Sequence, residues 1–168
     1  FPDFVMIGKA WYPNHLFNKN SDSYKFMGLF PHNEKQIQLP LYLSTCDNSN
    51  IFIEHNESTI EACHEFTHNI MWSFLSEIPV SKLNISIFDC ERRGGSITPF
   101  LEFRKKAPSV FDDQIHTNKE AVHKSLQRFN AEIDDRIQFR LGNKYKSIID
   151  YNNNNPLRSE RLHLLVIN

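Results

Sequence analysis

Three residues, His64, Glu65 and His68, follow the pattern His-Glu-x-x-His and could support zinc chemistry. On a helix, this spacing places two imidazole rings on one face, one turn apart, and leaves the carboxylate free to polarise a metal-bound water. A hydrolytic site needs a third protein ligand, and neither a following Gly-x-x-His nor a Glu on an obvious second helix supplies one. We therefore predict an exposed polar helix face with Phe66 turned inward and no bound metal, and keep a zinc hydrolase as the alternative.

Asp89 directly follows an apolar run that predicts a buried strand. In α/β folds, ligands bind at the carboxyl ends of parallel strands. Asp89 could therefore lie near a ligand, or it could cap the turn that follows its strand. We favour the cap.

Charged residues in the middle of the chain could contact a partner. The basic cluster could meet DNA phosphates or an acidic protein, although a solvated loop is the simpler interpretation. Its members are Arg92, Arg93, Arg104, Lys105 and Lys106. Further along, Asp135 and Arg136 end an acidic-to-Arg segment of a predicted helix, which could form an i, i+4 pair or face a neighbouring subunit. We treat four of these residues as candidate interface residues: Arg92, Arg93, Asp135 and Arg136.

The composition is that of an ordinary soluble domain. The chain has 168 residues, of which 40% are hydrophobic and 23% charged, enough to build one core. Its net charge of −1 excludes a global basic field for nucleic acid. The 3 Cys are an odd number at wide spacing, which favours reduced thiols in a cytoplasmic protein over a disulfide scaffold.

The two ends of the sequence suggest a fragment of a longer protein. The chain begins without Met, lacks the features of a signal peptide, and closes on an apolar run that reads as a buried strand. No apolar stretch approaches the ~20 residues of a membrane helix. We therefore predict no membrane insertion in this segment, although the parent protein could be tethered to a membrane complex.

The first part of the chain predicts short strands and loops. Pro, Gly, Asn and Ser punctuate it between apolar runs. We expect strands at 4–7, 37–43 and 51–53, the first of them closed by Gly8. Between them we expect irregular loops around an edge hairpin at 11–33 and a turn at 47–50.

The remainder predicts helices alternating with strands. Apolar positions at helical spacing, with capping candidates Ser58 and Thr59, predict a helix that ends before Pro79. A longer apolar stripe predicts a helix that begins after Thr117, with Glu120 at the capping-box position, and ends at Gly142. We expect strands at 83–88, 110–116 and 162–167, a short helix at 147–152, and a solvated Asn-rich loop around 152–155. Strands that alternate with helices indicate an α/β fold with a parallel sheet covered on both faces.

The chain from Leu39 onward resembles the first half of an FtsK/SpoIIIE-type motor ATPase domain, a family related to the ATPases of type VII secretion. The match is most specific from Ile85 to the C-terminus, where order and spacing both agree. Its matching segments are Ile85–Asp89, Gly94-Gly95, Thr117–Glu120, Glu132–Arg136, Ile148–Asn152 and Glu160–Leu162 with the strand after it. From Leu39 to Leu75 only the order of elements agrees.

The resemblance implies a P-loop NTPase (RecA-like) fold, a three-layer core with a mostly parallel sheet, present here as a partial domain. Residues 1–38 would be an N-terminal strand and loop extension, and residues 39–168 the degenerate core. The nucleotide-binding positions would survive only as vestiges, at Ser58, Thr59, Glu61, Asp89 and Asn168.

The catalytic motifs of that family are missing. A phosphate-binding loop needs Gly, whose backbone N–H groups turn towards the phosphates, and a Lys to neutralise their charge. The corresponding segment, 55–64, contains neither residue type and is rich in Glu. At the other side of the site, Asn168 stands where the family has the Asp that supports magnesium. Loss of both motifs predicts a motor fold without ATPase activity of its own.

We therefore expect a degenerate module of a bacterial DNA-translocating or secretion motor, with a structural, regulatory or interaction role. Its partners would be neighbouring ATPase domains or subunits, and DNA or a secreted substrate. We expect no cofactor. Two alternatives stay open: a part of an active translocase that still binds ATP and magnesium, and the zinc hydrolase at His64, Glu65 and His68.

Overall fold

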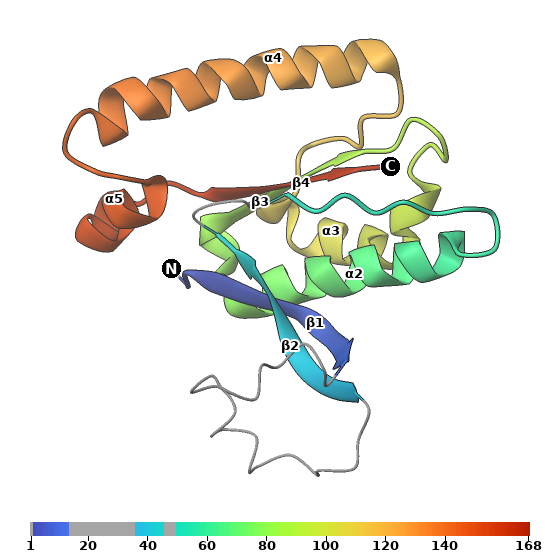
Figure 1. Ribbon diagram of the computed structural model, residues 1–168. Coiled ribbons are helices and arrows are strands. Elements are labelled where there is room, and N and C mark those ends of the chain that lie inside the picture. Colours follow the sequence, from blue (N-terminus) through green and yellow to red (C-terminus); the bar gives the residue numbers. More distant parts are fainter. Residues whose placement is uncertain (1, 14–35, 46–49) are drawn as a thin grey trace.

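The computed structural model describes residues 2–13, 36–45 and 50–168 (Figure 1). Its strands and main helices are β1 (Phe4–Pro13), β2 (Gln36–Ser44), α2 (Ile60–Glu77), β3 (Leu83–Phe88), α3 (Leu101–Lys106), α4 (Lys119–Arg136), α5 (Ile148–Asn154) and β4 (Leu162–Ile167). In this part of the chain, no helix is both long enough and apolar enough to cross a membrane.

β3 and β4 form a parallel two-stranded sheet at the centre of the fold. Their register pairs Leu83 with Leu162 and Phe88 with Ile167. The connection between them contains α3, α4 and α5, so the pairing is a long crossover of the kind that parallel strands need. α2 and α3 lie on one side of the sheet and α4 lies on the other (Figure 1). The predicted mixed α/β class is thus confirmed.

The core lies between this sheet and α2. β3 is almost wholly buried, as expected for a strand between two layers. Its apolar side chains pack with the inward residues of α2 and with the segment after β3. The most completely buried large members are Phe100, Met71, Ile78, Leu83, Ile85 and Ile97.

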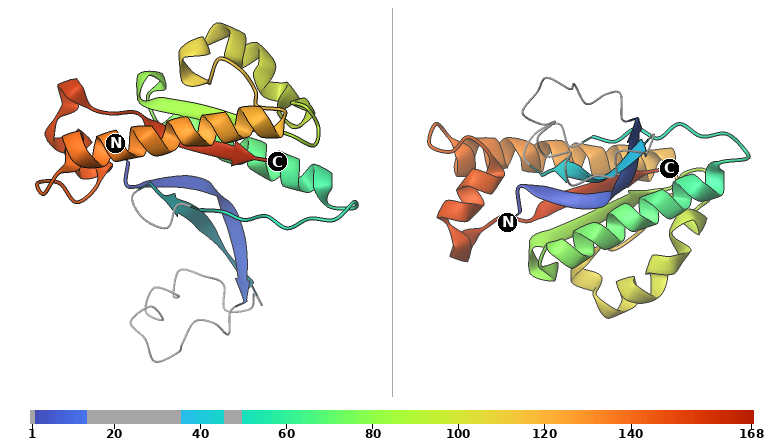
Figure 2. Two further views of the ribbon diagram at one scale, coloured as in Figure 1. Left: turned by 90° about the horizontal axis from the view of Figure 1, so that it is seen from above. Right: turned by 60° about the horizontal axis from the view of Figure 1, so that its bottom comes forward.

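β1 and β2 form a separate antiparallel pair that packs across α2 (Figures 1 and 2). The strand predicted to end at Gly8 continues to Pro13, and the register shifts between Met6 and Gly8, which marks a bulge. A Cβ on Gly8 would lie 3.9 Å from the Phe66 ring, so this strand runs close to α2. Phe66 packs against the core, which confirms that it is turned inward.

The extent of β1 corrects the predicted loop at 11–33, because residues 11–13 belong to the strand and residues 14–33 lie outside the described part. The strand at 37–43 is confirmed as β2. The predicted boundary between residues 38 and 39 falls inside β2. Most of the predicted turn at 47–50 lies outside the described residues.

Two predicted strands are not formed. Residues 51–53 are extended but join no ladder, and Phe52 is 92% exposed. The segment 110–116 makes only isolated parallel bridges to β3, at Phe111 and His116. Both sequences have strand composition, but a strand also needs a backbone partner along its length, which composition does not reveal.

The three predicted helices form, as α2, α4 and α5, and differ from the predictions only at their ends, whereas α3 was not predicted. The side chain of Asn118, rather than Thr117, caps α4 by accepting a bond from Ala121 N at 2.9 Å. A π-helical turn at Ile137–Leu141 carries α4 to Gly142, whose φ of 50° ends it. The apolar stripe of α4 is only partly covered, because Ile133 and Ile137 are each 52% exposed.

The Asn-rich segment predicted as a solvated loop belongs partly to α5. Ser147 caps that helix by accepting a bond from Asp150 N at 3.1 Å. Asn152 is buried and holds the backbone of Glu160 from both sides, with contacts of 2.9 Å to its oxygen and 2.7 Å from its nitrogen. A buried carboxamide that both donates to and accepts from the backbone of one residue fixes the approach to β4.

Candidate functional site

A hollow of about 550 Å³ opens between α2, the extended segment 50–55 and β4. Its polar end lies where β3 and β4 finish, and it is lined there by Asp89, Arg92, His64 and Asn168. This is the edge at which parallel sheets bind ligands. The structure therefore brings two of the predicted vestigial residues, Asp89 and Asn168, to one hollow.

Asp89 is fully buried, and its carboxylate binds its own loop. Oδ1 accepts a bond from Arg92 N at 2.8 Å, while Oδ2 accepts bonds from Gly94 N at 2.8 Å and Ser96 Oγ at 2.7 Å. Burial alone would raise the pKa of Asp89, but the bonds from Ser96, Arg92 and Gly94 lower it below its usual value. The structure confirms that Asp89 caps the turn after its strand.

That carboxylate holds a loop with two left-handed residues. Arg93 has a φ of 53° and Gly94 a φ of 90°. Left-handed backbone turns successive N–H groups inward, and here they meet the carboxylate of Asp89 instead of an external anion. Both carboxylate oxygens of Asp89 thus already accept hydrogen bonds from the loop that follows β3.

Asn168 joins this arrangement through Ser96. Its backbone N donates to Phe88 O at 2.8 Å, and its Nδ2 donates to Ser96 Oγ at 2.8 Å. Ser96 Oγ in turn donates to Asp89. The two predicted residues are thus linked through a serine that the sequence did not single out. A carboxamide at Asn168 adds no negative charge for a metal ion.

The start of α2 does not present hydroxyl groups to the hollow. Ser58 Oγ donates to Asn56 Oδ1 at 2.7 Å, and Thr59 Oγ1 accepts from Asn56 N at 3.0 Å. Neither Ser58 nor Thr59 lines the hollow, and Thr59 makes no side-chain cap to the helix. The structure therefore separates these two predicted residues from Asp89 and Asn168, and uses them in the turn before α2.

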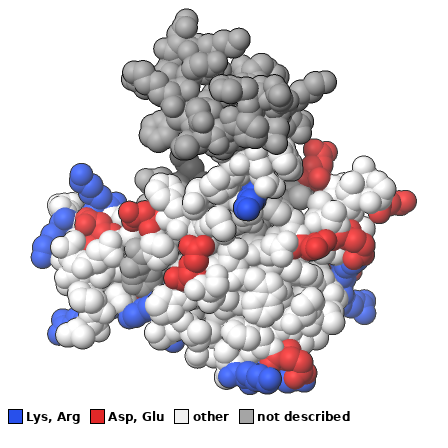
Figure 3. Space-filling view, turned by 90° about the horizontal axis from the view of Figure 1, so that it is seen from below, with Lys and Arg blue, Asp and Glu red and all other residues white. Residues whose placement is uncertain are grey.

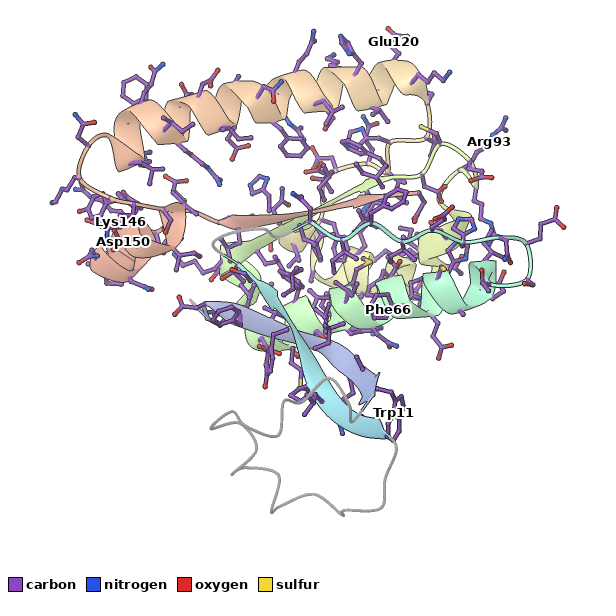
Figure 4. All side chains as sticks on the ribbon, viewed as in Figure 1. Trp11, Phe66, Arg93, Glu120, Lys146 and Asp150 are labelled. Atoms are coloured by element: carbon purple, nitrogen blue, oxygen red, sulfur yellow. The ribbon has the colours of Figure 1, made fainter. Side chains whose placement is uncertain are left out.

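Arg92 bridges the loop after β3 to α2. Its guanidinium lies 3.5 Å from Glu61 Oε1 and 3.2 Å from His64 Nδ1. Because a guanidinium only donates, His64 accepts at Nδ1. The contacts are half-exposed, so they orient Arg92 more than they stabilise the fold. Arg93 instead projects outward from the loop (Figure 4).

The second histidine of the zinc motif has a structural partner. His68 Nε2 lies 2.5 Å from the Ser96 backbone oxygen, to which it must donate, and its ring packs edge-on against Phe100 at 5.5 Å. Within residues 2–13, 36–45 and 50–168, no group of three His, Cys, Asp or Glu side chains is placed to hold a metal ion. These contacts give the zinc alternative no support.

Arg136, predicted as a candidate interface residue, bonds within the chain instead. Its side chain is only 18% exposed and connects α4 to β4. Its guanidinium contacts Glu132 Oε1 at 2.7 Å, the Arg161 carbonyl at 3.0 Å and His163 Nε2 at 3.3 Å. The neighbouring Asp135 is exposed. The two adjacent residues thus have different environments.

Replacing Arg136 by Ala should lower the free energy of unfolding by about 2 kcal/mol, because the bonds from a largely buried guanidinium to three acceptors are lost. Replacing Asp135 by Ala should change it by less than about 0.5 kcal/mol. Urea unfolding of both variants measures the difference. Equal, small effects would show that Arg136 is free for a partner after all.

The other half of the predicted basic cluster lies on α3 and is partly engaged. Arg104 donates to the Asp112 carbonyl at 3.0 Å, and Lys105 pairs with Glu102 at 2.6 Å. On the face shown in Figure 3, basic and acidic side chains are interspersed near the margins. Mixed charge of this kind holds no phosphate backbone by itself.

Comparison with known proteins finds no matching family model, no matching curated protein and no matching solved structure.

Proposed function

We propose that this chain is a degenerate FtsK/SpoIIIE-like module with a partial RecA-like core, which serves as a structural or interaction domain of a DNA-translocating or secretion motor. The observation that carries the proposal is that the side chains of Asp89 and Asn168 are both hydrogen-bonded within the chain. Both residues converge at the carboxyl edge of the parallel strands, and both are satisfied by Ser96 and the loop after β3.

The charge at the start of α2 supports the same proposal. A helix N-terminus favours anions, but Glu57 and Glu61 occupy this one. Glu61 is itself the partner of Arg92, the one cation among the residues that line the described hollow. A polyphosphate would have to displace Glu61 from Arg92 and approach two carboxylates without a Lys.

Arg92 favours one alternative, residual nucleotide binding. It lies at the mouth of the hollow with a half-exposed side chain, where a phosphate could compete with Glu61. In that alternative the chain is a part of an active translocase, and Arg92 replaces the missing Lys as the phosphate contact.

Thermal unfolding with millimolar ATP–Mg²⁺, together with an assay of phosphate release, separates these proposals. We expect no phosphate release and no rise in melting temperature, because a ligand raises the melting temperature only if it binds the folded state. Glu61→Gln is a useful second sample, since it frees Arg92 without adding a cation. A concentration-dependent rise in the wild-type chain, lost in Arg92→Ala, would favour the nucleotide-binding alternative.

A further inference from the structure

The outer edge of β4 lacks a backbone partner within the described residues. β4 pairs with β3 on one side only. Asn168 N bonds Phe88 O in that ladder, so by alternation Leu165 and Ile167 direct their backbone groups to the outer edge. Their side chains are 40% and 68% exposed, although parallel strands are normally covered. Another extended chain can form hydrogen bonds to the backbone groups of such an edge.

The hollow described above lies along this edge. Its second wall is the extended segment 50–55, which joins no ladder, and its floor is the inner face of α2. Ile51, Ile53, Ile70, Leu164 and Val166 line it, so most of its length is apolar. A segment seated there would meet backbone on one flank and apolar side chains beneath.

Charge distinguishes the two ends of the hollow. At the carboxyl end of β4, Glu91 and Arg92 line the hollow and Glu61 pairs with Arg92, so two carboxylates accompany one guanidinium. Both carboxylates belong to exposed residues. A segment that leaves the hollow at this end is therefore favoured if it carries positive charge there.

We infer that the hollow receives an extended apolar peptide segment of a partner protein, which adds to β4 as a parallel strand and carries Lys or Arg directly after its apolar run. The parallel direction follows β3 and both isolated bridges, all of which are parallel. This inference rests on the proposed interaction role and names the chemistry of the partner. It uses the strand-addition mode of peptide recognition.

The test is fluorescence anisotropy with a labelled peptide, Thr-Val-Ile-Val-Thr-Val-Lys-Lys. We expect saturable binding, and binding at least about tenfold weaker when the two Lys are replaced by Glu. Two further peptides carry N-methyl groups on the two alternate sets of backbone nitrogens. Only one set faces β4, so methylation of that set should abolish binding and methylation of the other set should leave it intact. Equal binding of both methylated peptides would overturn strand addition.

A protein variant gives the matched control. Leu165→Pro removes one outward N–H without touching the ladder to β3, and should abolish binding, whereas Leu165→Val should retain it. If Leu165→Pro does not fold, the methylated peptides still decide the question. A chain that dimerises by sedimentation, with the dimer lost in Leu165→Pro, would assign the edge to a second copy and overturn the peptide partner.

Failure of this inference is separable from failure of the proposed function. Peptide binding together with thermal stabilisation by ATP would keep strand addition and reject the degenerate nucleotide site. The absence of peptide binding, with no effect of ATP, would reject strand addition and keep the degenerate site.

Discussion

Replacing Asp89 by Ala should lower the free energy of unfolding by about 3–5 kcal/mol, because bonds to a buried carboxylate are strong and their loss leaves buried donors unpaired. The donors affected are Arg92 N, Gly94 N and the Ser96 hydroxyl. Urea unfolding measures the effect through the midpoint and slope. The control is Asp113→Ala at an exposed position, which should change the free energy by less than about 0.5 kcal/mol. Similar effects of the two substitutions would mean that the loop does not depend on Asp89.

The same carboxylate gives a dependence on pH. The folded pKa of Asp89 is below its usual value of 3.8, so its contribution to stability is present above that value and lost as pH falls through the folded pKa. Asp112 has a lowered pKa as well, because the bonds and charges around it outweigh the effect of burial. Asp89→Asn should therefore weaken, but not remove, the loss of stability as the pH falls below about 4. The measurement is the urea midpoint of the wild-type chain and of Asp89→Asn at several pH values. If the midpoint falls equally steeply with decreasing pH in both, the account is wrong.

Replacing Phe100 by Ala should lower the free energy of unfolding by about 3–5 kcal/mol, the usual result of removing a large buried ring. Phe100 is fully buried and packs against the Trp72 ring at 4.6 Å and the His68 ring at 5.5 Å. It therefore attaches α2 to the segment that follows the Asp89 loop. Thermal or urea unfolding measures the loss.

Phe139→Ala is the matched control for Phe100→Ala. The ring of Phe139 is 71% exposed, so the same substitution should change the free energy by less than about 0.5 kcal/mol. A large effect at Phe139 would indicate that the end of α4 is covered in solution, for instance by a second copy of the chain.

Elements with long periodic patterns could be predicted from the sequence, and those that depend on distant partners could not. α2 and α4 carry apolar residues over many turns, and this pattern survives whatever packs against it. Residues 51–53 have the composition of a strand, but their backbone has no partner in the described part of the chain. The composition of a segment shows that its side chains suit the surface of a sheet, but it does not show whether a partner strand lies beside it.

The candidate site could be predicted in part for a topological reason. Asp89 and Asn168 each follow an apolar strand, and the carboxyl ends of parallel strands meet at one edge. Ser96 could not be predicted, because its place depends on the left-handed turn at Gly94 that brings it back to Asp89. The role of His68 was missed for a similar reason, since its partner is a backbone oxygen that leaves no sequence signal.

The difference between Asp135 and Arg136 illustrates the same limit. Helical spacing predicts that Arg136 can reach Glu132, and the structure has that pair. Spacing does not reveal that β4 passes close by and supplies His163, or that the residue before it supplies the Arg161 carbonyl. Local rules identify a pair on one helix, whereas burial of that pair depends on the rest of the fold.

One measurement tests the central claim most directly: a titration of the ¹⁵N-labelled chain with ATP–Mg²⁺, followed by its two-dimensional amide spectrum. The account predicts that the amide resonances of residues 57–62 and 89–96 stay in place, because Glu61 and Asp89 already hold the groups that a phosphate would need. Saturable shifts confined to those two segments would contradict it and establish a working nucleotide site.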